Sequence, residues 1–498
     1  MQPTVVLSTG KIRGRTVGGV SAFLGIPYAE APIGPWAFAA PRPVRAWDGV
    51  RDAITLGPTA PQPSYQPPYD QLLANPFIDG PDFLNLNVWA PADSEGLPSG
   101  EGLPVMVWLH GGAFRNGSNA VPTYDGTAFA RDGVVLVSAN YRLGVQGFGV
   151  VRDAPANRGL LDQLAALAWV QENAAVFGGD PARVTVFGES AGGMSVATLV
   201  SMPAARGLFH RAIVQSGSAQ AVAEQADAAN VTLEVAKRLG VEPTAEGLGS
   251  VAVPALIAAQ GDVAAELRAR PDPQRWGRTT ISAGFGVMPF FPVIDGRLIS
   301  RMPLDAIIDG EGRDVDLLTG TTSDEFRLFM VPTGVAAGLP AEALPQALAQ
   351  LGIDPALAGV YAANRPRQSP GDVLAAIVTD GFFTMPTVRL ADAHASTGGK
   401  SFMYEFAWPS PLGGLGACHA LEIGFVFDTL GEAAARLTGP NPPQSLADEV
   451  HGAWVSFAAT GDPGWGRYGN GARPVLRFDH PESCQVENPR PDELARWQ

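Results

Sequence analysis

Cysteine is scarce in this sequence, with only Cys418 and Cys484 among 498 residues. Two cysteines form at most one bridge, so the chain has no disulfide framework of the kind that supports small secreted domains. One bridge between them stays an alternative. We expect a free, buried pair, because unpaired cysteine is among the most buried residue types.

Long apolar runs and clusters of positive charge are also missing. No stretch approaches the roughly 18 consecutive apolar residues of a transmembrane helix, and residues 1–15 lack the apolar core of a signal peptide. The net charge of −15 disfavours nucleic acid and anionic membranes as partners and mildly favours neutral or cationic ligands. We therefore expect a cytoplasmic protein.

Short apolar segments alternate with helical patterns along most of the chain. Near-continuous apolar strands joined by helices indicate an α/β fold with a mostly parallel sheet covered on both faces. Helices are expected at Leu160–Ala174, which carries an apolar stripe, and at Met194–Met202. The expected strands are Val105–Leu109, Val134–Val137, Val184–Phe187, Ala212–Val214, Asp316–Thr319 and Ser401–Phe406.

Two regions depart from this alternation. Residues 31–68 are rich in proline and glycine, which predicts loops and a few antiparallel strands in the N-terminal part. Residues 219–372 hold several alanine-rich helical patterns, of which Ala341–Leu351 is the clearest. We predict one domain over residues 1–498, with 219–372 as a helical insertion covering the active end of the sheet.

A serine flanked by glycines stands where a predicted strand passes into a predicted helix. The strand Val184–Phe187 is followed directly by Gly-Glu-Ser-Ala-Gly at residues 188–192. Such a turn strains the serine backbone and lifts its hydroxyl above the sheet, and the helix N-terminus favours negative charge there. We expect Ser190 to be a nucleophile. The alternative is a structural turn in which the serine only caps the helix.

A second glycine-rich turn, His110–Phe114, follows the strand ending at Leu109. Glycine lets backbone N–H groups turn toward a bound carbonyl oxygen without interference from a Cβ. Together with the N–H of Ala191, this turn could supply the three donors of an oxyanion hole. The alternative is a plain Gly-Gly turn.

The general base follows largely by elimination. The histidines are His110, His210, His394, His419, His451 and His480. The first two precede or flank the serine turn in the wrong order, and the last lies in an Asp-His-Pro turn. His394 and His451 fall in predicted helices, His394 on an exposed stretch. His419 follows a loop after the last clear strand, where a mobile catalytic histidine is expected, so it is the candidate base; an ordinary loop histidine is the alternative.

The orienting acid should follow a strand between Ser190 and His419 in the chain. Asp324 and Glu325 stand just past the strand that begins at Asp316, and residue chemistry does not choose between them. Glu422 lies three residues after His419, a spacing that also suits a metal site. No second His/Glu pair and no Cys-x-x-Cys accompanies it, so we expect no metal.

At this point the chain resembles the type-B carboxylesterases, the cholinesterase-like α/β-hydrolases. The stretches that match, in family order, are Gly25–Ala29, Leu84–Val88, His110–Phe114, Asn140–Gly144, Phe177–Gly193, Gln215–Ser218, Pro292–Gly296, Asp324–Glu325, His419–Phe427 and Trp454–Ala458. Two positions differ from the family pattern. Phe83 replaces a cysteine, which removes the N-terminal disulfide loop of secreted relatives, and Phe326 replaces a glycine after the acidic pair.

The resemblance implies an α/β-hydrolase fold and a Ser-Glu-His triad in which Glu325, rather than Asp324, is the acid. The oxyanion donors that it implies are Gly111, Gly112 and Ala191, and the polar residues beside the triad are Glu189, Ser216 and Glu422. A buried carboxylate in such a network must be hydrogen-bonded or protonated. Glu422 is therefore expected to support the triad rather than bind metal.

These residues predict a carboxylesterase that cleaves small to medium apolar esters through an acyl-enzyme at Ser190, without a cofactor. The partner is a small-molecule ester, with no nucleic acid and no membrane. The alternatives are a hydrolase of thioesters, carbamates or amides, and a non-catalytic binding or adhesion protein. Candidates for an apolar pocket are Phe114, Phe285, Phe329 and Met330.

Overall fold

The computed structural model describes residues 2–94, 102–284, 286–469 and 471–497. Its centre is a sheet in the order β16-β15-β14-β13-β10-β9-β7-β8-β6-β4-β3. These strands are β3 Arg15–Val17, β4 Val20–Pro27, β6 Asn85–Pro91, β7 Leu103–Leu109, β8 Val135–Ala139, β9 Gly179–Glu189, β10 Arg211–Gln215, β13 Asp316–Thr322, β14 Ser401–Phe406, β15 Pro474–Phe478 and β16 Cys484–Glu487.

The sheet is mostly parallel, as predicted. Every pairing from β8 through β7, β9, β10, β13 and β14 to β15 is parallel. The pairings at both edges, which involve β3, β4, β6 and β16, are antiparallel. The N-terminal part adds a small sheet of β1 Thr4–Leu7, β2 Gly10–Arg13 and β5 Val50–Asp52. In it β1 and β2 pair antiparallel, as expected for this part of the chain, whereas β2 and β5 pair parallel.

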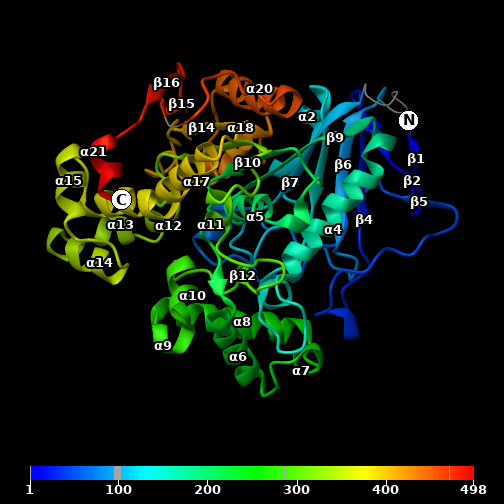
Figure 1. The fold of residues 1–498 in the computed structure, drawn as a ribbon, viewed down its shortest axis with the longest axis horizontal. Coiled ribbons are helices and arrows are strands. Elements are labelled where there is room, and N and C mark those ends of the chain that lie inside the picture. The colour runs from blue at the N-terminus through cyan, green and yellow to red at the C-terminus, as the bar shows by residue number, and fades with distance from the viewer. Residues whose placement is uncertain (1, 95–101, 285, 470, 498) are drawn as a thin grey trace.

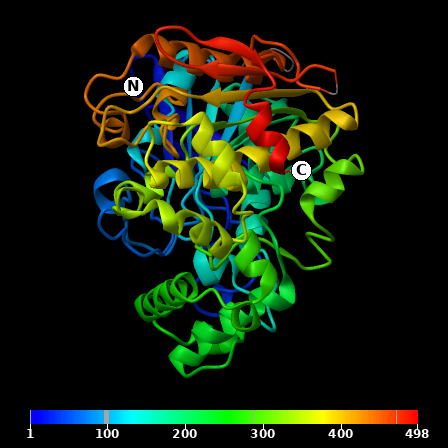
Figure 2. The ribbon, with the colours of Figure 1, turned by 90° about the vertical axis from the view of Figure 1, so that its left-hand side faces the viewer.

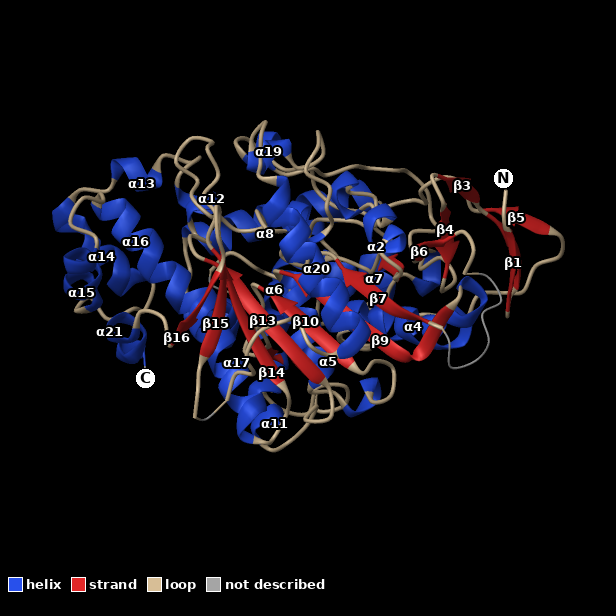
Figure 3. Ribbon diagram, turned by 90° about the horizontal axis from the view of Figure 1, so that it is seen from above, coloured by secondary structure: helices blue, strands red, loops and turns tan. Residues whose placement is uncertain are grey.

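Helices cover both faces of this sheet, which twists between them in Figure 3. Side chains alternate along each strand. Val105, Val107 and Leu109 of β7 belong to one core, while Met106 and Trp108 belong to the other. All five are fully buried. A strand that is apolar at every position therefore fills two cores at once.

The two helices expected on either side of the serine turn are present. The helix expected at Leu160–Ala174 is α4 Arg158–Asn173, and the helix after the serine turn is α5 Ala191–Val200. The remaining helices of this half and of the C-terminal part are α1 Tyr69–Leu72, α2 Thr127–Arg131, α3 Gly144–Phe148, α17 Met385–Ser396, α18 Ile423–Val426, α19 Ala435–Thr438, α20 Gln444–Thr460 and α21 Pro491–Leu494.

Residues 219–372 contain two groups of helices, because strand β13 of the central sheet lies within that range. Most of the first group forms the green lobe at the bottom of Figures 1 and 2: α6 Gln225–Leu239, α7 Ala245–Gly249, α8 Val253–Ala269, α9 Pro273–Trp276 and α10 Arg278–Ala283, with the short pair β11 Ala223–Glu224 and β12 Val293–Ile294. The last helix of this group, α11 Pro303–Ile308, packs against α17 and α5 instead. The second group is α12 Arg327–Met330, α13 Val335–Gly338, α14 Leu344–Gln350, α15 Leu357–Asn364 and α16 Pro370–Thr379. The division into one domain with a cap stays a prediction.

One helical stretch of the described chain, Pro370–Ser396, is long and apolar enough to cross a membrane. It joins α16 and α17 through a π-helical turn, Asp380–Thr384. Its most apolar window has a mean hydropathy of 1.3, and 72% of that window is buried inside the protein. This burial is typical of a core helix.

Two smaller expectations were wrong. Both cysteines are free, but only Cys418 is buried and Cys484 is exposed on an edge strand. His394 lies in a helix, as predicted, yet it is fully buried rather than on the surface. It contacts Ser401 Oγ through Nδ1 at 2.8 Å and Gly312 O through Nε2 at 3.2 Å. The face of helix α17 that packs against the sheet carries His394 together with buried alanines, so His394 points into the protein.

Candidate active site

The predicted site residues follow five neighbouring strands: the glycine turn follows β7, Ser190 follows β9, Ser216 follows β10, Glu325 follows β13, and His419 and Glu422 lie in the loop after β14. The carboxyl ends of parallel strands lie at one edge of a sheet, where ligands bind in open α/β folds. Register brings these ends together, since Leu109 pairs with Gly188, and Gln215 pairs with both Glu189 and Gly320. Predictions from separate parts of the chain thus meet at one place.

Ser190 occupies the sharp turn between β9 and α5. Its backbone angles are φ 56° and ψ −122°, a conformation that costs a side-chain-bearing residue about 1–3 kcal/mol. The backbone is held from both sides, because Ser190 N donates to Gln215 O at 2.9 Å and Ser190 O accepts from Met194 N at 2.8 Å. Ser190 stands at the helix cap position without a side-chain capping bond. The alternative that it serves as a cap is therefore not supported.

The glycines of this turn are required by the closeness of neighbouring backbones. A Cβ on Gly192 would lie 1.9 Å from Leu109 O, and a Cβ on Gly188 would lie 2.6 Å from the same oxygen. Neither position tolerates a side chain without moving β7 away. The two glycines of the Gly-x-Ser-x-Gly pattern are therefore needed because β7 packs closely against the turn.

The glycine turn after β7 lies directly beside the serine. A Cβ on Gly111 would come within 3.2 Å of Ser190 Cβ, and Gly112 has φ 109°, which favours glycine. Within the described residues, the backbone N–H groups of Gly111, Gly112 and Ala191 donate no hydrogen bond. Three free donors therefore border the serine.

His110 holds the start of this turn. Its ring stacks on Tyr141 with centroids 4.5 Å apart, and the Tyr141 hydroxyl donates to His110 O at 2.7 Å. Burial lowers the pKa of His110 to about 4, so the ring is neutral near pH 7. A neutral, packed imidazole acts as a structural support of this turn, in agreement with the choice of another histidine as the candidate base.

His419 lies in a buried contact with Glu325. Its Nδ1 is 2.5 Å from Glu325 Oε2. The other carboxylate oxygen, Oε1, accepts from Ser216 Oγ at 2.6 Å and from Thr322 N at 2.9 Å. Such bonds fix the carboxylate and, through it, the tautomer and orientation of the imidazole. Residues 94 apart in the chain are thereby brought together.

Asp324, the other candidate acid, bonds to the backbone of Ala417 and not to His419. Its Oδ2 accepts from Ala417 N at 3.1 Å, and its own N–H donates to Ala417 O at 2.9 Å. These bonds hold the loop that carries His419 two residues later. The geometry therefore separates the two carboxylates that residue chemistry left open.

The second ring nitrogen of His419 faces Glu189 in this structure. His419 Nε2 is 3.0 Å from Glu189 Oε1, and within the described residues no hydrogen bond joins it to Ser190 Oγ. Burial alone would lower the pKa of His419, but the nearby Glu189 and Glu325 carboxylates outweigh it and raise that pKa to about 9. The predicted serine–histidine bond is thus not formed here.

A polar network that the sequence only partly revealed supports the acidic residues. Gln215 Nε2 donates to Glu422 Oε1 at 3.0 Å, and Trp454 Nε1 donates to Gln215 Oε1 at 3.1 Å. Burial raises the pKa of Glu189 to about 8 and that of Glu422 to about 7. Gln215 and Trp454 were not singled out, although both lie in stretches that match the family.

Aromatic rings close the site around His419. The ring of Phe329 lies 5.4 Å from that of His419, and the ring of Phe383 lies 4.9 Å from it. Phe329 was a predicted pocket residue; Phe383, on the π-helical turn, was missed because local sequence does not announce such a turn. Of the other candidates, Phe114 and Met330 are buried and Phe285 lies outside the described residues.

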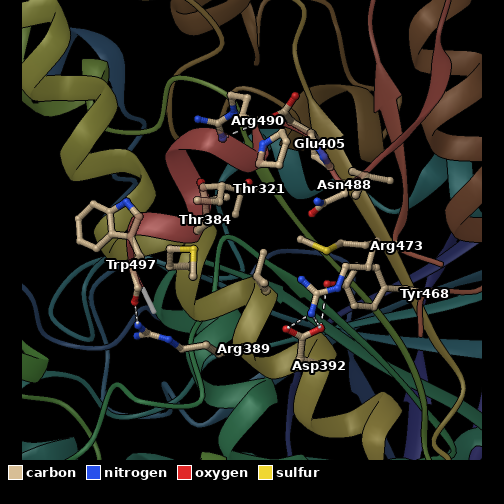
Figure 4. Close-up of a pocket in the computed structure, with 18 of the residues that line it drawn as sticks. Thr321, Thr384, Arg389, Asp392, Glu405, Tyr468, Arg473, Asn488, Arg490 and Trp497 are labelled. Atoms are coloured by element: carbon tan, nitrogen blue, oxygen red, sulfur yellow. Dashed lines mark hydrogen bonds and ion pairs between the residues drawn. The ribbon is translucent and has the colours of Figure 1, made fainter. Parts of the chain in front are cut away.

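A separate cavity of about 220 Å³ lies beside the C-terminal segment, between α17, β14 and β15 (Figure 4). Arg473 binds both oxygens of Asp392 at 3.0 Å, and Arg389 donates to Trp497 O at 2.9 Å. Neither the predicted nucleophile nor the predicted base lines this cavity. Its polar contacts attach the C-terminal segment to the sheet.

The sequence and the fold of this chain were compared with those of known proteins, and both match carboxylesterases. The family model described as the carboxylesterase family matches residues 1–497. The chain is 38% identical to para-nitrobenzyl esterase of Bacillus subtilis (strain 168), covering 97% of this chain and 96% of that one. It is 35% identical to phenmedipham hydrolase of Pseudarthrobacter oxydans, covering 93% and 91%. The crystal structure of Geobacillus stearothermophilus carboxylesterase EST55 at pH 6.2 superposes with a TM-score of 0.84 at 37% identity, covering 99% and 100%.

Proposed function

The chain belongs to the carboxylesterase family and is an ester-hydrolysing enzyme, and we propose that it acts through a covalent acyl-enzyme on Ser190. The observation that carries this proposal is the strained Ser190, bordered by free N–H donors and by the buried His419–Glu325 contact. Along the chain the nucleophile Ser190 comes first, then the acid Glu325 and then the base His419, which is the order expected of this fold. The substrates are small to medium apolar esters.

In the proposed mechanism His419 takes the proton of Ser190 while the hydroxyl oxygen attacks the ester carbonyl. Because His419 Nε2 faces Glu189 before substrate binds, we infer that it exchanges Glu189 for Ser190 when the ester enters. Catalytic hydrogen bonds often form only in the substrate complex. Glu325 keeps Nδ1 protonated and stabilises the imidazolium.

The negative charge of the tetrahedral intermediate would be held by the N–H groups of Gly111, Gly112 and Ala191. Each such donor is worth roughly 3 kcal/mol of barrier. His419 then protonates the leaving alcohol, and the same residue activates the water that hydrolyses the acyl-enzyme. No step needs a metal or another cofactor. Glu189, Ser216 and Glu422 serve as supporting residues, and a cytoplasmic location is part of the same proposal.

The experiment that tests the acyl-enzyme is a rapid-mixing assay with p-nitrophenyl acetate. We expect a burst of nitrophenol stoichiometric with enzyme, followed by steady release, because acylation precedes deacylation. Mass spectrometry of the quenched enzyme should find an acetyl group on the peptide that contains Ser190. Steady turnover with no adduct on that peptide, or an adduct on another residue, would contradict the proposal.

Glu189 offers a pH-dependent test of the base. We expect Glu189→Gln to move the acidic limb of the kcat/KM profile to lower pH. In the wild type, burial opposes the imidazolium but Glu189 and Glu325 raise the His419 pKa to about 9, so the neutral base forms only as pH rises toward that value. Removing one carboxylate lowers this pKa, and the neutral base is present at lower pH.

The control for this test is Glu422→Gln. The Glu422 carboxylate acts on the same imidazole, but less strongly than Glu189 or Glu325. Its removal should therefore shift the acidic limb by a smaller amount. Profiles measured with p-nitrophenyl butyrate from about pH 5 to 10 cover the range in which the imidazole titrates. An unchanged limb in Glu189→Gln would show that Glu189 does not govern the base.

A further inference from the structure

The C-terminal segment, residues 490–497, packs against the π-helical turn Asp380–Thr384. A Cβ on Gly381 would lie 2.7 Å from Trp497 Cη2 and 2.9 Å from Trp497 Cζ3, so the indole lies directly on the backbone of the turn. Two hydrogen bonds hold the indole there. Trp497 Nε1 donates to the Tyr361 hydroxyl at 2.9 Å, and Trp497 O accepts from Arg389 Nη2 at 2.9 Å (Figure 4). The position of Trp497 against the turn is therefore fixed.

An ion pair joins the same segment to the first residue of the turn. Asp380 is fully buried, and Arg490 binds both of its carboxylate oxygens, Nη1 to Oδ2 at 2.7 Å and Nη2 to Oδ1 at 2.9 Å. The Tyr361 hydroxyl also donates to Asp380 Oδ2, at 2.6 Å. A buried carboxylate needs such partners, and a two-bond arginine pair fixes the orientation of both groups. The segment thus holds the turn at two successive residues, 380 and 381.

On its other side the π-helical turn reaches the proposed acid and base. Phe383 is buried, and its ring lies 4.9 Å from that of His419. Thr379, the residue before the turn, accepts from Phe326 N at 3.0 Å, and Phe326 directly follows Glu325. Turns of this kind are rare and often lie at functional sites. The turn therefore connects the C-terminal segment with the proposed active site.

Aromatic rings at the start of α12 support the turn from the side of the site. The Phe326 ring lies 5.5 Å from that of Phe382 and 6.3 Å from that of Phe383. It also lies 5.2 Å from Phe329, whose ring contacts His419. Phe326 stands where the family pattern has glycine, so its ring adds a contact between α12 and the turn that glycine could not make.

The place of the Phe383 ring matters for the proposed chemistry. In the proposed mechanism the His419 imidazole faces Glu189 before the ester binds and Ser190 during attack. The rings of Phe383 and Phe329 both contact this imidazole, so the room in which it turns depends on where the two rings are held. A displacement of about 1 Å in a reacting group can lower a rate roughly a hundredfold. Movement of the turn should therefore alter the rate of the chemical step.

The segment has a second attachment that does not pass through the turn. Glu493 is buried and accepts from Asn364 Nδ2 at 2.8 Å and from Arg365 Nη2 at 3.0 Å, at the end of α15. Loss of the Trp497 indole should therefore loosen the turn without releasing the segment. This allows an effect on the turn to be separated from loss of the whole segment.

We propose that the C-terminal segment positions the base of this enzyme, because Trp497 and Arg490 hold the π-helical turn and the turn holds the Phe383 ring against the His419 imidazole. Trp497 and Arg490 are positioning residues, since they act on His419 through the turn. The proposal rests on the proposed function of Ser190 and His419. The competing explanation is that the segment only adds stability to the fold.

Burst kinetics with p-nitrophenyl acetate separate these two explanations. The burst amplitude counts competent sites, and the burst rate constant at saturating ester measures acylation at each site. A purely structural role changes the amplitude and leaves the rate constant as it is. We expect Trp497→Ala to lower the rate constant about tenfold. Trp497→Phe keeps an aromatic ring against Gly381 and should retain most of the rate.

Trp465→Ala is the matched control. Trp465 is also half-buried, and its Nε1 donates one hydrogen bond, to Met403 O at 2.9 Å, but its ring packs on Phe402 and Phe478. This variant loses the same ring and the same kind of bond away from the turn, so its burst rate constant should equal that of the wild type.

Arg389→Gln is a milder change at the same place. It removes the bond to Trp497 O and leaves the indole itself intact. We expect it to lower the burst rate constant about twofold to fivefold, the effect of one hydrogen bond. It provides the decisive measurement if Trp497→Ala does not fold.

A double-mutant cycle tests the route through Phe383. Phe383→Leu alone should lower the burst rate constant about tenfold. If Trp497 acts through Phe383, the two losses should not add. We therefore expect Trp497→Ala to cause less than about a twofold further loss when Phe383 is already leucine.

Three results would overturn the proposal. The first is a wild-type rate constant in Trp497→Ala, or in Arg389→Gln if the alanine variant does not fold. The second is an equal loss in Trp465→Ala and Trp497→Ala, and the third is full additivity in the cycle with Phe383→Leu. A wild type without a burst would instead count against the function of Ser190, which keeps the two proposals distinct.

Discussion

Replacing Ser190 by alanine is expected to lower kcat by roughly 10⁵–10⁶-fold, since no other hydroxyl can take over the covalent step and removal of a triad nucleophile has effects of this size. The residual rate would come from the free N–H donors of Gly111, Gly112 and Ala191. Steady-state rates with p-nitrophenyl butyrate measure the loss. Activity within about tenfold of the wild type would rule out Ser190 as the nucleophile.

Ser190→Gly separates loss of chemistry from loss of folding. Alanine keeps the strained φ of 56°, whereas glycine adopts a positive φ without a steric penalty. We expect Ser190→Gly to unfold at a higher temperature than Ser190→Ala, by an amount corresponding to about 1 kcal/mol of unfolding free energy, and to be equally inactive. Thermal unfolding beside the activity assay measures both. If the glycine variant were less stable than the alanine variant, the strain argument would be wrong.

Glu325→Gln is expected to lower kcat by roughly 10⁴-fold, the effect of losing the carboxylate that sets the histidine tautomer. Glu325 is buried, and its Oε2 lies 2.5 Å from His419 Nδ1. A glutamine of the same shape can offer its N–H₂ group to that nitrogen, which would place the imidazole proton on Nε2 and leave no base facing Ser190. The kcat for p-nitrophenyl butyrate above and below neutral pH measures the loss.

Asp324→Asn is the matched control for this variant. The asparagine oxygen can still accept from Ala417 N, the bond that Asp324 Oδ2 makes at 3.1 Å. We expect the loop to stay in place and kcat to fall by less than about tenfold. The reverse ranking of the two variants would make Asp324 the orienting acid. A large loss in both would point to the loop that carries His419, and circular dichroism would then show whether folding is affected.

Local patterns were sufficient for most of the central fold. The six predicted strands are present, because a run such as Val105–Leu109 is apolar at every position and only a strand covered on both faces buries it all. The glycine turn around Ser190 was equally predictable, since a Cβ on Gly188 or Gly192 would collide with Leu109 O. One of these six strands, β13, lies inside residues 219–372, so the alanine-rich patterns of that range belong to two groups of helices on either side of it.

Other parts of the site could not be obtained from local patterns. Buried His394 was predicted to lie on the surface, because helical periodicity alone does not say which face of α17 meets the sheet. Phe383, whose ring contacts that of His419, lies in a π-helical turn, and local sequence patterns do not predict such a turn. Gln215 connects Trp454 to Glu422, a network whose members come from three separate parts of the chain.

The sequence by itself determined the alternation of strands and helices, the serine turn, the glycine turn beside it and a short list of candidate acids and bases. Each of these depends on a few adjacent residues and on steric limits within them. The family resemblance of the sequence already pointed to Glu325 rather than Asp324, but only the tertiary structure showed that the Glu325 carboxylate meets His419 Nδ1 and that His419 Nε2 faces Glu189. These relations join segments about 90 to 230 residues apart, and such distances are fixed by how the strands and helices pack rather than by local chain preferences.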